Sequence, residues 1–458
     1  MAKVVLIGAG STSFSPSVLA NMVHSQDLAG STLALVDVDA DILQTMVKLA
    51  ERVVRETGAK LTIEGSTDRR DLLRGADFVV TTVAAGSTES WLLDIDIPAK
   101  YGLSQPVGDS VGPGGLSRAF RHIPILVGVA RDMEQLCPDA YLFNYTNPMT
   151  ALCRAVRRST TINAIGLCVG PLLTRADLSR FIGLPAEQVQ YHGAGVNHCF
   201  WILDFRYQGQ DVYGIARDKA AGGKSADSAM KAMDTLAIDY PELQAIAQQP
   251  LPEQRPFCVE MLDSVGYFPG PGDRHVTEFF PEFFPKGPGD DARYGLGAYP
   301  VSTVIERART LRESLAKQAA GEIPLDSRLI EGKIGHSEEV VAIMSSVVKN
   351  HGLLLYGNIP NRGLVANLPR DAIVEVPVTF GSYGWRAYGV GDLPASLMPW
   401  TTRRLATVEL TVEAALTGDR KVALQALLAD GWVHSPSEGK ALLDDLLKAQ
   451  AAYLPQFR

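Results

Sequence analysis

The sequence contains few cysteines and no long apolar run. Its five cysteines are odd in number and scattered over 458 residues, which excludes the paired framework of a small secreted disulfide protein. No segment reaches the roughly 18 uninterrupted apolar residues of a membrane-spanning helix. The chain runs from Met1-Ala2-Lys3 into a short apolar stretch without a small-residue cleavage site, so no secretory signal is expected. We therefore predict a soluble, cytoplasmic protein with reduced thiols.

A block of positive charge is also absent. The formal net charge is -8, and acidic and basic residues are interspersed. Such a distribution excludes nucleic acid or an anionic membrane as the main partner. The chain does have 46% apolar residues, enough for a substantial core, and a length that predicts two domains or a fused pair. Small-molecule chemistry is the expected class of function.

The first 165 residues alternate apolar strands with amphipathic helical stretches. This alternation predicts an α/β domain with a Rossmann-like, doubly wound parallel sheet. Strands are expected at residues 4–8, 32–37, 77–83, 140–145 and 162–167. Helices are expected at 40–55 and at 123–137, the latter entered through Pro124. Residues 166–458 are expected to form a second, α+β domain with a helical C-terminal part.

A glycine-rich turn follows the first expected strand. It reads Gly8-Ala9-Gly10-Ser11-Thr12-Ser13 and precedes an expected helix at 16–24. The two glycines allow a tight turn and close backbone approach, and the helix N-terminus offers unpaired amides to a pyrophosphate. Ser13 replaces the third glycine of the usual fingerprint, which weakens the motif but keeps its geometry. Gly8, Gly10, Ser11, Thr12 and Ser13 are therefore the predicted cofactor-binding residues of this turn.

An acidic residue ends the second expected strand. The Asp37 carboxylate can accept hydrogen bonds from the adenosine ribose hydroxyls, and it would repel a 2'-phosphate, so NAD is favoured over NADP. An aspartate in such a place often only caps the next helix, and Asp39 is available for that role.

Asn147 lies in Asn144-Tyr145-Thr146-Asn147-Pro148, at the carboxyl end of a strand, where doubly wound folds bind ligands. Its amide could hold the nicotinamide ribose or a substrate hydroxyl. The Asn-Pro pair is equally an ordinary turn signal.

Cys168 and His198 form a candidate metal pair. Cys168 ends a strand at the same carboxyl edge, and His198 lies in the next strand-like segment, so the two side chains can converge. A thiolate with an imidazole suits a borderline divalent ion that keeps open positions for substrate oxygens. A buried free cysteine is, however, usually only a small apolar residue, and spacing alone leaves both interpretations open.

The assembled residues resemble the NAD-dependent glycoside hydrolases of family 4, in the branch of α-galactosidases and uronic acid glycosidases or a close sister family. The resemblance runs over nearly the whole chain. It rests on these ordered segments: the opening GAGS at 8–11; Asp37; Ile97 to Gly102; Val111 to Gly115 with Arg118 and Arg121 to Pro124; Asn144 to Met149; Gly166 to Cys168; Gly195 to His198; Asn358 to Asn361 with Gly363; Asn367 to Pro369; and Val374 to Pro377.

The resemblance implies elimination and addition rather than the paired carboxylates of ordinary glycosidases. NAD would take the hydride from C3 of the sugar, a base would remove the acidified C2 proton, and the C1 substituent would leave. Water would then add, and the reduced cofactor would return its hydride. A divalent ion, typically manganese in such enzymes, would bind the C2 and C3 oxygens. Cys168 and His198 match the metal ligands of the family.

The resemblance also assigns catalytic roles. Tyr267 is the candidate base, although a packed aromatic is the alternative, and Asp109 matches an acidic position near the sugar. Many members carry a polar residue after the metal cysteine that protonates the leaving group. Here that residue is Val169, so the proton must come from another group, such as Asp109 or Glu278, or the leaving group must be reactive.

The expected substrate contacts are Arg118, Asn147, Asn197, Arg274 and His275. The two arginines and His275 could equally face solvent. Residues 84–91, after the strand at 77–83, contain no cation to clamp a phosphate, so a phosphosugar is disfavoured. The run at 272–275 could meet a carboxylate or sulfonate at C6, and an anionic, non-phosphorylated glycoside is therefore predicted.

Two rival functions are compatible with the sequence. A lactate- or malate-type dehydrogenase acting on a hydroxy acid or sugar would share the N-terminal fold and the Asn-Pro turn, and the second domain is expected to resemble the C-terminal domain of those enzymes. An NAD-binding regulator without catalysis is the other rival. A homodimer or homotetramer is expected from the resemblance.

Overall fold

The computed structural model describes residues 1–222, 255–284, 286–290, 293–332 and 338–458. One sheet of thirteen strands runs through this part of the chain, in the order β10-β8-β7-β12-β11-β6-β5-β4-β1-β2-β3, with β13 beside β12 and β9 beside β8. The strands are β1 Lys3–Ile7, β2 Thr32–Val36, β3 Thr62–Ser66, β4 Phe78–Thr81, β5 Tyr141–Asn144, β6 Asn163–Gly166, β7 Val189–Val196, β8 Cys199–Tyr207, β9 Gln210–Asp211, β10 Phe268–Gly270, β11 Leu353–Pro360, β12 Ile373–Gly381 and β13 Gly384–Ala387.

The N-terminal half of the sheet is parallel, as predicted. Strands β1 to β6 pair only in parallel with one another. Along β1, Val4 and Leu6 belong to one buried cluster, whereas Val5 and Ile7 belong to another cluster on the opposite face. Helices therefore cover both faces, and this is why the strand is apolar throughout instead of alternating. The predicted doubly wound α/β fold is confirmed for this half.

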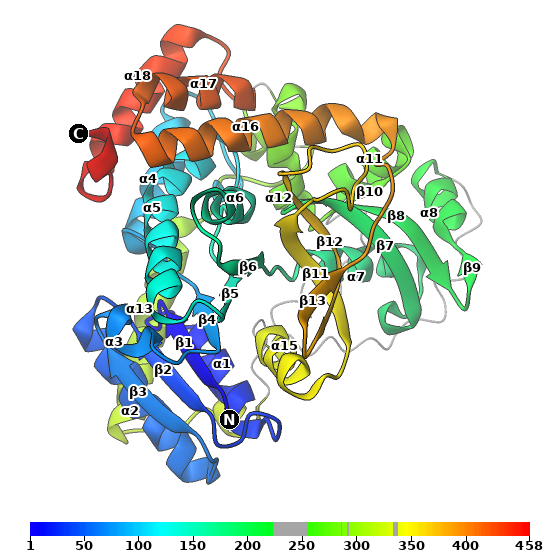
Figure 1. The fold of residues 1–458 in the computed structure, drawn as a ribbon. Coiled ribbons are helices and arrows are strands. Elements are labelled where there is room, and N and C mark those ends of the chain that lie inside the picture. The colour runs from blue at the N-terminus through cyan, green and yellow to red at the C-terminus, as the bar shows by residue number, and fades with distance from the viewer. Residues whose placement is uncertain (223–254, 285, 291–292, 333–337) are drawn as a thin grey trace.

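Helices surround both halves of the sheet (Figure 1). Their bounds are α1 Phe14–His24, α2 Ala40–Thr57, α3 Arg69–Leu73, α4 Ser87–Ala99, α5 Gly112–Leu136, α6 Met149–Ser159, α7 Gly170–Ile182, α8 Tyr213–Ala220, α11 Pro256–Val265, α12 Asp273–Val276, α13 Val301–Ala320, α14 Ser327–Glu331, α15 Glu338–Lys349, α16 Met398–Thr417, α17 Arg420–Asp430 and α18 Pro436–Ala449.

Helix α5 is longer than the sequence predicts. It begins at Gly112, with Pro113 in its first turn, and contains Pro124 in its interior. A proline inside a helix leaves the carbonyl four residues earlier without its usual donor. Here the Gln456 side chain donates to the Phe120 carbonyl oxygen at 2.8 Å. The prediction that Pro124 marks the start of the helix is therefore wrong, because a distant residue satisfies the orphaned carbonyl.

The two halves of the sheet meet at a single pairing, between Gly166 of β6 and Asn358 of β11. Helices α16 to α18 share one buried cluster with β1, β5 and α5, so the helical C-terminal part packs on the N-terminal half. In Figure 1, α16 crosses from the side of β10 to α5 and α6. The boundary at residue 165 remains a prediction, and residues from both sides of it build the cores.

Within the described ranges, none of the helices combines the length and the apolar character needed to cross a membrane.

Candidate active site

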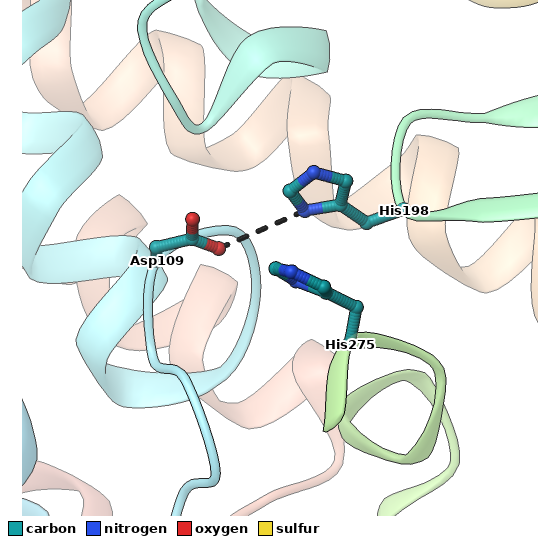
Figure 2. A group of neighbouring side chains, drawn as sticks. All are labelled: Asp109, His198 and His275. Carbon is teal, nitrogen blue, oxygen red and sulfur yellow. Dashed lines mark ion pairs between the residues drawn. The ribbon is translucent and has the colours of Figure 1, made fainter. Parts of the chain in front are cut away.

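Four loops and one short helix bring polar side chains to the carboxyl edge of the parallel strands. Asp109 and Ser110 precede α5, Asn147 follows β5, and Cys168 follows β6. His198 lies in the turn between β7 and β8, and His275 lies on α12. Figure 2 shows Asp109, His198 and His275 pointing toward one another from three separate elements.

The backbone of His198 adopts an uncommon conformation. Val196 pairs with Cys199, so Asn197 and His198 alone connect β7 to β8. The φ angle of His198 is +64°, in the left-handed region that residues other than glycine seldom occupy. The residue is only 5% exposed. A strained, buried histidine of this kind is typical of a functional site.

Asp109 and His198 shift each other's pKa. The His198 Nδ1 atom lies 3.7 Å from Asp109 Oδ1. Burial favours the neutral acid, yet His198, His275 and Arg118 together hold the pKa of Asp109 well below its ordinary value. Burial likewise disfavours a charged imidazole, but Cys168 and Asp109 raise the pKa of His198 well above its ordinary value. The structure thus brings the predicted pair Cys168 and His198 together, beside Asp109.

His275 joins this group. Its ring centroid lies 4.0 Å from that of His198. Burial and the neighbouring His198 lower the pKa of His275 to about 3, so its imidazole is neutral and keeps a lone pair. Ligand atoms of Asp109, His198 and His275 lie within 4.8 Å of one another. Imidazole and carboxylate donors with an adjacent thiol suit a divalent transition-metal ion. Sequence reasoning had assigned His275 to the substrate only.

The glycine-rich turn is shaped by its neighbours. Gly8 has a φ of +94°, and a Cβ there would meet the Thr82 carbonyl oxygen, so only glycine fits. The Gly10 amide donates to Asp37 Oδ2 at 2.7 Å. Asp37 therefore holds the turn while its carboxylate stays at the strand end where a ribose is expected.

The capping role belongs to the neighbouring aspartate. Asp39 is the N-cap of α2, and its carboxylate accepts from the Asp41 and Ile42 amides. The alternative raised from the sequence is confirmed for Asp39, which leaves Asp37 free of that role.

The N-terminus of α1 directly follows the glycine turn. Ser11 Oγ accepts from the Phe14 amide at 3.2 Å, and Ser13, at the N-cap, makes no side-chain capping bond. Thr12 lies between them and is partly exposed. The amides of Phe14, Ser15 and Ser17 have acceptors within the turn, and Pro16 has no N–H, so the unpaired amides expected from the sequence are not found at these four positions. The glycine turn itself keeps the place where dinucleotide folds bind a pyrophosphate.

Asn147 is hydrogen-bonded to the polar group. Its Nδ2 atom donates to Asp109 Oδ2 at 2.9 Å, and its buried Oδ1 has no hydrogen-bond partner among the described residues. His122 accepts from the Ala85 amide on Nε2, so its Nδ1 donates to the Asn147 carbonyl oxygen at 2.8 Å. An orphaned, buried amide oxygen so held fits a ribose or sugar hydroxyl.

Tyr267 is not part of this group. Its ring packs against Tyr213, with centroids 6.4 Å apart, and under Arg217. Since Phe268 pairs with Ile202, Tyr267 lies roughly 16 Å along β8 from His198, at about 3.3 Å per residue. The assignment of Tyr267 as the base stays a prediction that these contacts do not support.

The two predicted arginines lie over different rings of one aromatic stack. Trp91 and Tyr299 stack with centroids 4.7 Å apart. Arg118 lies over Trp91 at 5.5 Å and Arg274 over Tyr299 at 5.9 Å. Arg118 Nε is buried without a hydrogen-bond partner in the described ranges, and Arg118 also acts on Asp109. Arg118 thus acts on Asp109 of the polar group, and Arg274 acts on His275.

Two further carboxyl groups near the site, those of Glu278 and Glu375, are buried. Glu278 is 1% exposed, and its Oε1 accepts from the Val107 and Gly108 amides at 2.8 and 2.9 Å. Burial raises its pKa to about 8. Burial also raises the pKa of Glu375 to about 7, with Asn358 donating to it at 2.7 Å. Through its two hydrogen bonds from Val107 and Gly108, Glu278 holds the loop that carries Asp109.

The raised pKa of Glu278 predicts a pH-dependent stability. Between pH values of about 4.5 and 8, the folded state keeps a proton that the unfolded chain has released. The free energy of unfolding should therefore fall as the pH rises through this window, by an amount on the order of a few kcal/mol. Glu278→Gln removes this contribution, so urea denaturation from pH 5 to pH 9 should show a flatter profile than the wild type.

The matched control is Glu51→Gln, on the exposed face of α2. It should keep the wild-type slope. Equal slopes for Glu278→Gln and the wild type would show that Glu278 is ionised in the folded protein.

Comparison with known proteins places the chain in a family. The family 4 glycosyl hydrolase model matches residues 3–184, and the model of the C-terminal domain of that family matches residues 193–433. The α-galactosidase of Bacillus subtilis is 29% identical over 469 aligned residues that cover 100% of both chains. The α-galacturonidase of Thermoanaerobacterium saccharolyticum is 27% identical, covering 98% of this chain and 96% of its own.

A solved structure shares the fold. The 6-phospho-α-glucosidase from gut microorganisms, determined in complex with NAD and Mn²⁺, covers 100% of both chains with a TM-score of 0.81 at 20% identity. The two family models, which extend over both halves of the sheet, establish that the chain belongs to the family 4 glycosyl hydrolases.

Proposed function

We propose that this family 4 enzyme cleaves a non-phosphorylated, anionic glycoside with the help of NAD and a divalent metal ion. The observation that carries the proposal is the meeting of Cys168, His198, His275 and Asp109 beside Asn147, at the sheet edge that also carries the glycine turn. The solved relative that holds both NAD and Mn²⁺ supports the same pair of groups here.

One set of residues would bind the metal ion, and another would bind the dinucleotide. Cys168 and His198 would hold the ion, with His275 and Asp109 in the same group. The dinucleotide would rest on Gly8, Gly10, Ser11, Thr12, Ser13, Asp37 and Asn147. When bound, NAD supplies hydride transfer at the sugar and the ion supplies Lewis acidity.

The protein's own groups orient the sugar. The orphaned Oδ1 of Asn147 can accept from a sugar hydroxyl, and Asn197 lies in the same turn as His198. Asp109 is ionised at neutral pH because its pKa is held low. It therefore does not supply the leaving-group proton that Val169 cannot supply. Glu278 keeps its proton at neutral pH, because burial raises its pKa to about 8.

The anionic part of the substrate rests on Arg118. Its guanidinium lies over Trp91 and has a free Nε, and residues 84–91 contain no second cation for a phosphate dianion. A hydrogen bond from a guanidinium to a single negative charge contributes about 1.5 to 3 kcal/mol. A carboxylate or sulfonate at C6 is the group that fits this charge.

The experiment is a cleavage assay with nitrophenyl galactosides and galacturonides of both anomers, with NAD and Mn²⁺ present or omitted. We expect nitrophenol release that needs both groups and leaves no net NADH. We also expect solvent deuterium to enter at C2. Stoichiometric NADH would instead identify a dehydrogenase, and the absence of both cleavage and exchange would identify a binding protein without catalysis.

The same assay tests the charge of the substrate. The galacturonide should be preferred over the galactoside, and Arg118→Met should reduce that preference by about 10-fold to 100-fold. Equal rates on both sugars in the wild type would contradict the anionic substrate while leaving the glycosidase intact.

A further inference from the structure

Ser110 lies between two members of the polar group. Its hydroxyl donates to Asp109 Oδ1 at 2.7 Å and lies 2.8 Å from His198 Nδ1. The direct distance from His198 Nδ1 to Asp109 Oδ1 is 3.7 Å, too long for a hydrogen bond. The carboxylate therefore reaches the imidazole through the serine hydroxyl.

The hydrogen bonds that connect Asp109, Ser110 and His198 allow only one consistent arrangement of donors and acceptors. Both carboxylate oxygens of Asp109 are acceptors, since Oδ2 takes a hydrogen from Asn147 and Oδ1 takes the hydroxyl hydrogen of Ser110. The Ser110 oxygen is then left to accept. His198 Nδ1 must carry the hydrogen that it donates, and in the neutral ring the lone pair lies on Nε2.

The geometry points to Ser110 as a positioning residue that fixes the Nδ1–H tautomer of His198, so that Nε2 is the metal-binding atom. The inference rests on the proposed metal-dependent function. Metal-ligating histidines commonly donate their other ring N–H to a carboxylate, a carbonyl or water, and losing that partner typically lowers metal affinity 10-fold to 100-fold. Here the Ser110 hydroxyl lies between the carboxylate and the imidazole and is hydrogen-bonded to both. Asp109 thus acts on the metal ligand through Ser110.

The strained backbone makes this partner more important. His198 is one of two residues that connect β7 to β8 and has a left-handed φ, so its side chain has little freedom to find another acceptor. The ring is also 4.0 Å from the ring of His275. Ser110 selects which nitrogen faces the ion, and the turn selects where the ring lies.

The test measures Mn²⁺ affinity by calorimetry on the full-length protein without NAD and without sugar. Ser110→Ala should bind Mn²⁺ about 10-fold to 100-fold more weakly than the wild type. Ser110→Thr keeps the hydroxyl and should restore most of the affinity. NAD affinity should stay unchanged in both, because Asn147 keeps its bond to Asp109.

Ser179→Ala is the matched control, since Ser179 is a fully buried serine on α7 whose hydroxyl has no hydrogen-bond partner in the described part of the chain. It should leave Mn²⁺ affinity at the wild-type value. In the His198→Ala background, Ser110→Ala should produce no further loss, because the residue acts through the imidazole.

A spectroscopic measurement reads the tautomer directly. Nitrogen-15 NMR of labelled histidine in the metal-free protein, at a pH high enough for the imidazole of His198 to be neutral, should assign the hydrogen of His198 to Nδ1, and Ser110→Ala should make the tautomers mix. A folded Ser110→Ala protein with wild-type Mn²⁺ affinity, or a His198 that carries its hydrogen on Nε2, would overturn the inference. If the wild-type protein itself does not bind Mn²⁺, the proposed metal dependence fails instead.

Discussion

Replacing Cys168 with alanine should abolish metal binding and lower kcat/KM for glycoside cleavage by about 10³-fold or more. The thiol lies close enough to His198 to raise the pKa of that imidazole, so the two side chains share one site. A Lewis acid contributes several kcal/mol of charge stabilisation, and about 4 kcal/mol corresponds to a factor of about 10³ in rate. Calorimetry with Mn²⁺ and the nitrophenyl glycoside assay measure the two effects.

Cys137→Ala is the matched control for this change. Cys137 is also a free cysteine, but it is buried in the core at the C-terminal end of α5, whereas Cys168 is only partly buried. Its loss should cost some stability and leave both metal affinity and cleavage unchanged. Full activity in Cys168→Ala would show that Cys168 is a packing residue, as the alternative from the sequence holds.

Replacing Asp37 with alanine should weaken NAD binding by about 10²-fold. The variant loses the acceptor for the Gly10 amide and the carboxylate expected to meet the ribose hydroxyls. Two hydrogen bonds to a charged group make about 3 kcal/mol a reasonable loss. The discrimination against NADP should fall at the same time, because the negative charge that repels a 2'-phosphate is gone. Fluorescence titration with both cofactors measures the change.

Asp39→Ala tests the neighbouring carboxylate, which caps α2. Losing an N-cap typically costs about 1 kcal/mol of stability, so its Tm should drop while NAD affinity stays near the wild-type value. If the two variants weakened NAD binding equally, Asp37 would act only by supporting the loop.

Local patterns predicted the strands that are buried on both faces. The apolar runs around Val4 and Phe78 stand out because helices cover both sides of β1 and β4. β3, Thr62–Ser66, was missed, since this edge strand is polar and partly exposed. The start of α5 was also missed, because the donor that makes Pro124 tolerable comes from Gln456 at the other end of the chain.

The family and its cofactor turn were accessible from the sequence, because they rest on short ordered motifs. The recognition of family 4 is confirmed. Ser110 was missed, because a serine beside an aspartate has no sequence signature of its own. Its role depends on a hydrogen bond to a residue 88 positions away. The assignment of Tyr267 as the base stays a prediction, because a family motif does not say which way a side chain between α11 and β10 points.

The sequence by itself determined the α/β class, the glycine turn with Asp37, and the pairing of Cys168 with His198 as a testable idea, because each depends on residues that are close in the chain or on ordered motifs. Only the tertiary structure decided that Asp109, Ser110 and His275 surround that pair. The reason is physical: α12, the β7–β8 turn and the loop before α5 meet through the register of β10 on β8 and through the amides that Glu278 holds in place. Contacts of this kind have no trace in a local pattern.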